Sequence, residues 1–251
     1  MKAMILCAGL GTRLRPWTLF HPKALVPVGG VPMLQRVIGS LVSQGFDDLT
    51  VNVHHFAGQI EDFLMSGCLS VDRVNVSDEA DCLLDTGGGI LRAECFLASD
   101  ADPFLVHNVD ILSNADLRNL YHTHVSSGRD VTLLVSDRQS DRRLVFSRDM
   151  RLKGWLNMKT RQTRPDNMDL SAEDLTLAFS GIYVMSPSVF SAMKTNGFTG
   201  SFPIMDFFLA GLPDVEIGGV VQRGLDIIDI GKPETLRRAN LEIGCDEVND
   251  A

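Results

Sequence analysis

The chain is 251 residues long and carries 23 Lys and Arg against 32 Asp and Glu, a net charge of −9. Its 45% hydrophobic and 22% charged residues are typical of a globular protein and disfavour collagen, coiled-coil and disordered chains; the length suits one large α/β domain or two small ones. No Asp or Glu precedes Asp47, so an acidic body follows a basic N-terminal fifth; this argues against a general nucleic-acid or membrane binder and favours a small anionic ligand near the N-terminus.

Residues 1–137 alternate strand-like apolar runs with helical patterns, which predicts a Rossmann-like mixed, mainly parallel sheet flanked by helices, an α/β fold. A buried first strand is expected over 2–7, and a helix over 32–44, where apolar residues recur on one face. The further elements expected in this half are strands over 49–53, 73–76, 104–107 and 131–135 and helices over 59–65, 88–97 and 116–125.

The pattern changes over residues 138–176, which are polar and charged and predict a hairpin around 144–146 and 152–156, then a mobile loop over 160–174. No repeat, low-complexity segment or linker divides the chain, so we expect one domain, 1–251, with halves 1–137 and 138–251 and a lid-like insert at 138–176. The remaining elements expected are a strand over 178–185, a helix opening at Pro187, a helix near 204–210, strands over 215–221 and 226–230, and a helix from Pro233.

Five cysteines, an odd number without a C-x-x-C pair, indicate neither a disulfide framework nor a zinc site and favour reduced thiols in a cytoplasmic protein. The apolar run over 3–8 is too short for the core of a signal peptide, and no stretch approaches the roughly 18 apolar residues of a membrane span. The adjacent His54 and His55 point to opposite faces at a strand end, which disfavours a shared metal ion.

A glycine-rich turn directly follows the first strand. Such a turn lets backbone N–H groups approach phosphate oxygens closely, and arginines add bidentate contacts. A dinucleotide fingerprint is disfavoured because Leu14 stands where its third glycine belongs, and the P-loop string is absent; a tight turn with solvated arginines is the plain alternative. The segment reads Cys7-Ala8-Gly9-Leu10-Gly11-Thr12-Arg13-Leu14-Arg15-Pro16 and then His21-Pro22-Lys23-Ala24-Leu25-Val26-Pro27-Val28.

Two carboxylates follow or lie within apolar strands. Asp110 comes just after the strand over 104–107, where a parallel sheet places residues that contact ligands, although a turn or cap Asp has the same appearance. Asp229 lies within the apolar run 225–230, where a charge is costly unless it is paired or binds a metal. Asp229 is therefore the more informative of the two.

The strings G-x-G-T-R-L-R-P and P-K-x-L-V-P-V resemble the signature of the nucleotidyltransferases that make nucleotide sugars from a nucleoside triphosphate and a sugar 1-phosphate. The T-G-G-G-I string resembles the short members of that family, such as the N-acetylmuramate 1-phosphate uridylyltransferases. The resemblance implies the nucleotide-diphospho-sugar transferase fold, here without the β-helix domain that often follows it. The other matching strings, in chain order, are Asp85-Thr86-Gly87-Gly88-Gly89-Ile90, Asn108-Val109-Asp110, Phe179-Ser180-Gly181-Ile182 and Ile228-Asp229-Ile230-Gly231.

The resemblance also implies roles for individual residues, with 1–137 as the nucleotide-binding half and 138–251 as the sugar-binding half. Val109 stands in place of the usual glycine, and the family's E-K-P lysine is missing, with Lys153 and Lys159 as open substitutes. The implied residues are Arg13, Lys23 and Asp110 for catalysis, Asp110 and Asp229 for Mg²⁺, Ala8, Gly9, Gly11, Thr12, Arg13, Thr86, Gly87 and Gly88 for the nucleotide, and Asn108, Ser180 and Gly181 for the sugar.

The implied reaction is attack of a sugar 1-phosphate on the α-phosphorus of a nucleoside triphosphate, with UTP favoured, expelling pyrophosphate. Crowded negative charge makes positioning, Mg²⁺ and cationic side chains the main needs of such chemistry. Guanylyl or cytidylyl transfer to mannose or heptose 1-phosphate or to phosphocholine stays open, as does a catalytically silent nucleotide-sugar-binding regulatory relative. A glycosyltransferase is disfavoured because Leu112 stands where its D-x-D motif needs an acid. We expect no nucleic-acid or membrane partner, and a monomer or small homo-oligomer.

Overall fold

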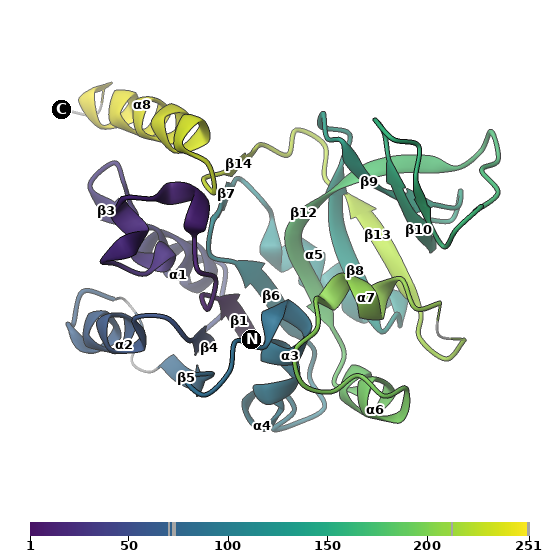
Figure 1. Ribbon diagram of the computed structural model, residues 1–251, viewed down its shortest axis with the longest axis horizontal. Coiled ribbons are helices and arrows are strands. Elements are labelled where there is room, and N and C mark those ends of the chain that lie inside the picture. The colour runs from purple at the N-terminus through teal and green to yellow at the C-terminus, as the bar shows by residue number, and fades with distance from the viewer. Residues whose placement is uncertain (70, 72–73, 212, 250–251) are drawn as a thin grey trace.

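The computed structural model (Figure 1) describes residues 1–69, 71, 74–211 and 213–249. Three short 3-10 turns, Thr12–Leu14, Trp17–Leu19 and Lys23–Leu25, follow the first strand. The strands are β1 (Lys2–Leu6), β2 (Pro27–Val28), β3 (Val31–Pro32), β4 (Asp48–Val53), β5 (Val74–Asp78), β6 (Phe104–Asn108), β7 (Ile111–Ser113), β8 (Val131–Ser136), β9 (Arg142–Phe146), β10 (Leu152–Asn157), β11 (Thr163–Arg164), β12 (Leu175–Met185), β13 (Ile217–Val221) and β14 (Ile227–Asp229). The helices are α1 (Met33–Ser43), α2 (Ala57–Met65), α3 (Asp85–Arg92), α4 (Glu94–Leu97), α5 (Leu117–Ser127), α6 (Ser188–Thr195), α7 (Ile204–Phe208) and α8 (Pro233–Asn249).

A ten-stranded mixed sheet runs through the molecule in the order β11-β10-β9-β12-β6-β1-β4-β5, with β8 beside β12 and β13 beside β8. The strands β6, β1, β4 and β5 are parallel to one another, whereas β12 runs antiparallel to β6. Every residue of β1 is buried, as its uninterrupted apolar run predicts for a central strand with both faces covered. The predicted Rossmann-like sheet flanked by helices is confirmed.

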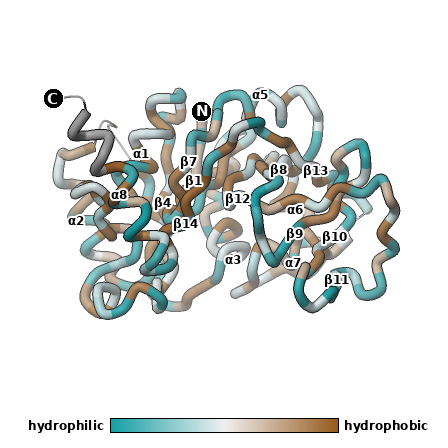
Figure 2. Tube along the Cα trace, turned by 90° about the horizontal axis from the view of Figure 1, so that it is seen from above, coloured by the Kyte–Doolittle hydropathy of each residue, from teal (hydrophilic) through white to brown (hydrophobic). Residues whose placement is uncertain are grey.

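Two hydrophobic cores lie on the two faces of the sheet. Because successive side chains of a strand alternate between faces, Ala3 and Ile5 of β1 belong to one core and Met4 and Leu6 to the other. The first core is closed by α1, α2, α5 and α8, the second by α3, α4, α6 and α7. The interior trace along β1 and β4 is accordingly hydrophobic in Figure 2. Helices on both faces hold the carboxyl ends of the parallel strands in fixed register.

The insert over 138–176 differs most from its predicted form. Its strands β9, β10 and β11 continue the main sheet, because β12 begins at Leu175 and its first three residues pair with β9. The predicted hairpin is present, but the loop expected over 160–174 contains β11, which pairs with β10. Figure 1 shows these strands at the opposite end of the molecule from α1, α2 and α8. The insert thus extends the main sheet by three strands.

Smaller differences concern element boundaries. The single helix expected over 88–97 is two helices, α3 and α4, which meet at Ala93, and α3 already begins at Asp85. Arg73, the first residue of the strand predicted over 73–76, lies outside the described residues, and β5 begins at Val74. No helix among the described residues is both long and apolar enough to cross a membrane.

Two buried histidines couple the fold to pH. His107 of β6 is 3% exposed, and its Nδ1 lies 2.8 Å from the carbonyl oxygen of Asn108. His124 of α5 is 1% exposed and lies between the hydroxyls of Thr132 and Ser186, each 2.9 Å away. Burial lowers the pKa of both imidazoles from 6.5 to about 4, so both are neutral in the folded protein at pH 7.

We therefore expect the free energy of unfolding to decrease between pH 7 and pH 5, by about 2 kcal/mol for each histidine. Unfolded histidine binds a proton below pH 6.5 whereas the folded one does not until about pH 4, so acid favours the unfolded state. Urea denaturation at the two pH values measures the effect. His124→Gln is expected to remove about half of the difference, and His122→Gln, on the exposed side of α5, none. Equal stability at pH 7 and pH 5 would contradict the assignment.

Candidate active site

The loop after β1 has the form expected of a phosphate-binding turn. Gly11 has a φ of 60°, and a Cβ atom added there would lie 2.9 Å from Cβ of Lys23 and 3.0 Å from Cγ2 of Thr18, so both conformation and space require glycine. The carbonyl oxygen of Gly11 accepts hydrogen bonds from the Thr18 hydroxyl and the Leu14 N–H, both at 2.9 Å. Within the described part of the chain, the backbone N–H groups of residues 9–11 donate to no protein acceptor. They remain available to a ligand.

A cavity of about 510 Å³ opens beside this loop, a volume in the usual range for small-molecule sites. It lies at the carboxyl ends of β1, β4 and β6, where ligands bind to open α/β sheets. Of the residues predicted for function, nine line it: Ala8, Gly9, Gly11, Thr12, Arg13, Lys23, Thr86, Asn108 and Asp110. Lining residues that were not predicted are Leu6, Leu10, Asn52, Leu83, Asp85, Ser201 and Gly231.

Lys23 and Asp110, which both line this cavity, form an ion pair at its edge. Their side chains are 14% and 15% exposed, so the pair is shielded from solvent on most sides. Lys23 is positioned by the 3-10 turn Lys23–Leu25, and Asp110 by the turn between β6 and β7. The sequence places these two residues 87 positions apart, and the sheet brings them together.

Asp229 reaches the same place through the pairing of β14 with β7. This antiparallel pair sets Asp229 opposite Ile111, and the N–H of Ile230 donates to the carbonyl oxygen of Asp110 at 2.9 Å. Gly231 lies at the centre of the resulting cluster. A Cβ atom added to Gly231 would lie 2.8 Å from Oδ1 of Asp229, 2.9 Å from Nη2 of Arg13 and 3.2 Å from Oδ2 of Asp110. Three of the predicted chemical groups therefore converge on one backbone position.

The donor set at this position fits a hard divalent cation. Two carboxylates converge there and would be the protein ligands of such an ion, and no group of three or more His, Cys, Asp or Glu that could hold a metal occurs among the described residues. Mg²⁺ commonly takes one or two carboxylates and completes its shell with water and substrate phosphates. Cys7 lies beneath the loop, and burial raises the pKa of its thiol, with Asp110 adding to the rise and Lys23 opposing it. The thiol is therefore protonated at neutral pH, which makes it a poor nucleophile.

The glycines at the start of α3 serve packing. The N–H groups of Gly87 and Gly88 donate to the carbonyl oxygen of Phe202, at 2.9 and 3.2 Å. A Cβ atom at Gly87 would overlap the Phe202 ring, and one at Gly88 would overlap the carbonyl oxygen of Gly200. Thr86 lines the cavity. Gly87 and Gly88, predicted to contact the nucleotide, are not among the residues that line it, and their N–H groups are bonded to Phe202.

A buried polar network that the sequence reasoning missed supports the cavity floor. Glu79 is 1% exposed; its Oε1 accepts from Nδ2 of Asn52 at 2.7 Å and its Oε2 from the N–H of Leu84 at 3.0 Å. Oδ1 of Asn52 in turn accepts from the N–H of Cys7 at 2.7 Å. The network joins the phosphate loop, the end of β4 and the approach to α3. A buried Asn at the carboxyl end of an apolar strand is the signal that points to it.

Glu79→Ala is expected to lower the free energy of unfolding by about 2–3 kcal/mol, because it leaves Asn52 and the N–H of Leu84 buried without acceptors. Urea denaturation measures the loss. Glu173→Ala is the matched control, since Glu173 is exposed in the insert; its effect is expected to stay within about 0.5 kcal/mol. Equal stability of the Glu79 variant and the unchanged protein would refute a supporting role for the network.

The three residues predicted for the sugar occupy different environments. Asn108 lines the cavity, and its amide packs on Gly181, where an added Cβ atom would lie 2.8 Å from Nδ2. Gly181 has a φ of 78°, which glycine adopts without strain. Ser180 is 1% exposed, and its hydroxyl donates to the carbonyl oxygen of Leu134 at 2.6 Å. Gly181 thus positions Asn108, and the Ser180 side chain faces the core.

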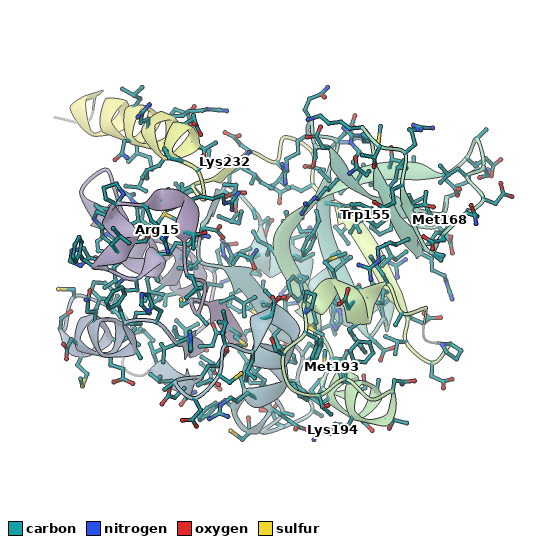
Figure 3. All side chains as sticks on the ribbon, in the orientation of Figure 1. Arg15, Trp155, Met168, Met193, Lys194 and Lys232 are labelled. Carbon is teal, nitrogen blue, oxygen red and sulfur yellow. The ribbon has the colours of Figure 1, made fainter. Side chains whose placement is uncertain are left out.

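A second cavity, of about 660 Å³, lies between the insert and α7. Arg15, near the phosphate loop, and Trp155, on β10, mark the two halves of the molecule in Figure 3.

Lys153 and Lys159, the two candidates to replace the missing E-K-P lysine, are both in ion pairs within the insert. Lys153 pairs with Asp174 at 2.6 Å and Lys159 with Asp141 at 2.7 Å. The residues that line the second cavity are Arg138, Ser140, Arg142, Arg143, Leu144, Trp155, Asn157, Gln162, Arg164, Phe179, Pro203, Met205, Asp206 and Leu209.

A family model described as the MobA-like NTP transferase domain matches residues 3–165, well over half of the chain. The chain belongs to the MobA-like NTP transferase family. The matched segment contains the phosphate loop, Lys23 and Asp110, and it ends before β12. The membership in a family of NTP transferases that the motifs led us to expect is confirmed.

Among curated relatives, an N-acetylmuramate alpha-1-phosphate uridylyltransferase of Caulobacter vibrioides is 28% identical over 92% of this chain and 92% of its own length. The bifunctional protein GlmU of Methanococcus aeolicus is 29% identical over 97% of this chain, which spans 54% of the length of that relative. A mannose-1-phosphate guanyltransferase of Gibberella zeae is 36% identical over 54% of this chain and 37% of its own length. The chain therefore spans about half or less of the length of some relatives, and nearly all of another.

Solved structures with the same fold include HddC of Yersinia pseudotuberculosis in complex with GMP-PN, with a TM-score of 0.76, 22% identity and coverage of 96% of this chain and 99% of that one. A UDP-glucose pyrophosphorylase of Acinetobacter baumannii has a TM-score of 0.78 at 17% identity and covers 98% of this chain and 93% of its own. At these identities the likeness extends to the fold alone. It covers the insert as well as the sheet.

Proposed function

We propose that the protein transfers UMP from UTP to a sugar 1-phosphate. A phosphate oxygen of the sugar 1-phosphate bonds to the α-phosphorus of UTP, the bond from that phosphorus to the α,β-bridging oxygen breaks, and pyrophosphate leaves with the electron pair. The observation that carries this proposal is the convergence of Arg13, Asp110 and Asp229 around Gly231, with Lys23 paired to Asp110 at the edge of the cavity.

Each group has a distinct part in this proposal. The free N–H groups of residues 9–11 and the guanidinium of Arg13 hold the β- and γ-phosphates, which depart as pyrophosphate. Lys23 places its ammonium where the two phosphates meet and offsets their mutual repulsion. Asp110 and Asp229 would hold Mg²⁺, which supplies charge neutralisation when bound. Positioning and electrostatics then account for catalysis, as phosphoryl transfer requires.

UTP is favoured over other nucleotides by one comparison. The relative that matches this chain over 92% of both lengths is named a uridylyltransferase, whereas the mannose-1-phosphate guanyltransferase of Gibberella zeae matches 54% of the chain. The match to the uridylyltransferase covers both the proposed nucleotide-binding half, 1–137, and the proposed sugar-binding half, 138–251. Guanylyl transfer is the second candidate, because the match to the guanyltransferase reaches 36% identity in the part that it covers.

A screen of pyrophosphate release tests the proposal. Each of UTP, GTP, CTP, ATP and dTTP is incubated with the protein, Mg²⁺ and a panel of sugar 1-phosphates, with phosphocholine as a further acceptor. We expect release with UTP and at least one sugar 1-phosphate. Release with GTP instead would favour the guanylyl alternative. Binding of a nucleotide sugar in calorimetry, without release in any pair, would identify a silent relative and refute the proposal.

A further inference from the structure

The second cavity concentrates positive charge in an acidic protein. Arg138, Arg142, Arg143 and Arg164 line it, and among the described residues that line it Asp206 is the one acidic side chain. The chain as a whole has a net charge of −9. A local excess of four arginines over one aspartate therefore runs against the overall charge and creates a positive potential that attracts an anion.

The four arginines divide into two that are held by the protein and two with free donors. Arg143 is 12% exposed and donates to Asp137 and to the carbonyl oxygens of Thr176 and Arg138, while its Nε is buried and has no partner. Arg164 pairs with Asp206 at 2.9 Å.

Arg138 and Arg142 keep most of their donors free. Arg138 uses one donor, Nη2, on the carbonyl oxygen of Phe179 at 2.9 Å. Arg142 is exposed and bonds to Ser140 through its backbone, and its side chain has no partner within the described part of the chain. A guanidinium carries five donors in a planar fork that matches a carboxylate or a phosphate, so these two side chains can bind an anion without breaking an existing contact.

The cavity adjoins the proposed reaction centre. Burial lowers the pKa of the Arg138 guanidinium, whereas the negative charge of Asp229 acts to raise it. The two side chains therefore lie near enough to interact electrostatically. One short segment of β12 contacts both cavities. Phe179 lines the second cavity, and two residues later Gly181 packs against the amide of Asn108, which lines the first.

The start of α7 is a second segment that contacts residues of both cavities. The N–H of Ile204 donates to the hydroxyl of Thr86 at 2.8 Å, and Thr86 lines the first cavity while the neighbouring Pro203 lines the second. A sugar whose 1-phosphate lies at Asp110 and Asp229 would therefore extend toward the arginines. Trp155 and Phe179 offer apolar surface for its ring faces.

We propose that this cavity selects sugar 1-phosphates that carry a second anionic group, a carboxylate or a phosphate ester, and that Arg138 and Arg142 are the residues that recognise it. The proposal rests on the proposed function, since it places the sugar of that reaction in the second cavity. Charge-assisted, bidentate contacts of this kind are the strong ones in proteins and favour the charged sugar over a neutral sugar of the same shape.

The test compares kcat/KM for matched acceptors in pyrophosphate release with UTP. Glucuronic acid 1-phosphate against glucose 1-phosphate, and N-acetylmuramic acid 1-phosphate against N-acetylglucosamine 1-phosphate, form the carboxylate arm; glucose 1,6-bisphosphate against glucose 1-phosphate forms the phosphate arm. We expect at least one anionic acceptor to exceed its neutral partner by about tenfold to a hundredfold. The arm in which this occurs identifies the group.

Arg138→Met and Arg142→Met are each expected to raise KM for the preferred acceptor by about tenfold or more and to change kcat/KM for the neutral partner less than threefold. Arg138→Lys, which keeps the charge, is expected to recover part of the loss. Arg148→Met is the matched control, because Arg148 is exposed in the turn between β9 and β10, outside the cavity, and is expected to leave kcat/KM unchanged.

The outcomes separate this inference from the proposed function. Pyrophosphate release with equal or better use of the neutral acceptors in both arms overturns the inference and leaves the proposed function intact. Equal loss for anionic and neutral acceptors in the arginine variants also overturns it, since it indicates a structural role. Absence of release with every acceptor, in folded protein with Mg²⁺, overturns both.

Discussion

Asp229→Asn is expected to lower kcat for pyrophosphate release at least a hundredfold, and Asp110→Asn is expected to do the same. Each change removes one of the two carboxylates that converge at Gly231 and keeps the volume of the side chain. An amide is a poorer ligand than a carboxylate for a hard cation, so the charge on the crowded phosphates is less well offset in the transition state. Losses of this size, about 2.7 kcal/mol or more, are typical when an electrostatic group is removed from a reaction centre.

The measurement is kcat under saturating UTP and acceptor, repeated over a range of Mg²⁺ concentrations. If Asp229 binds the ion, the apparent affinity for Mg²⁺ falls in the variant, an effect that a merely structural substitution does not produce. Asp226→Asn is the matched control, an exposed aspartate on the same approach to β14, and we expect it to keep both constants. Retained activity in both Asp110→Asn and Asp229→Asn would refute the metal assignment.

Lys23→Met is expected to lower kcat/KM by about 10²–10⁴. The substitution removes the cation proposed to bridge the two phosphates, and it leaves the 15% exposed carboxylate of Asp110 without its partner. Because Lys23 and Asp110 act on one another, the double variant Lys23→Met with Asp110→Asn is expected to lose less than the product of the two single losses. Initial rates of pyrophosphate release for the four proteins give this cycle.

Two further variants sharpen the lysine test. Lys23→Arg keeps the charge but changes its shape, and we expect it to recover part of the rate. Lys194→Met serves as the control, since Lys194 pairs with Glu94 of α4 and neither residue lines the cavity. Full activity in Lys23→Met would show that the ion pair supports structure alone.

Local sequence was sufficient for the parts of the site that a single segment forms. The apolar run of β1 and the glycines after it predict a strand followed by a phosphate loop, because a continuous run of apolar residues and a turn that needs Gly11 are both local properties. Asp229 was also visible locally, as a charge among isoleucines. The pairing of β14 with β7, which places it beside Asp110, joins segments more than a hundred residues apart and could not be read from either.

Long-range packing accounts for what the sequence did not predict. The nucleotide contacts of Gly87 and Gly88 stay a prediction. The structure shows that these glycines make room for Phe202 and Gly200, and a glycine with that role looks the same in sequence as one that makes room for a ligand. The insert was expected to contain a mobile loop over 160–174, but its strands pair with one another and with the first residues of β12, and this pairing joins segments that are distant in the sequence. Asn52 at the end of β4 is the local signal of the buried network, but its partner Glu79 follows β5 and could not be identified from the sequence around either residue.

Omission of single components from the complete reaction tests the account most directly. Pyrophosphate is measured with the protein, UTP, Mg²⁺ and the acceptor mixture together, and again with the acceptor or the Mg²⁺ left out. We predict release in the complete reaction and at most background in either omission, because attack on the α-phosphorus requires the sugar phosphate and the two carboxylates act through the cation. Release without an acceptor, or no release in the complete reaction with folded protein, would contradict the account.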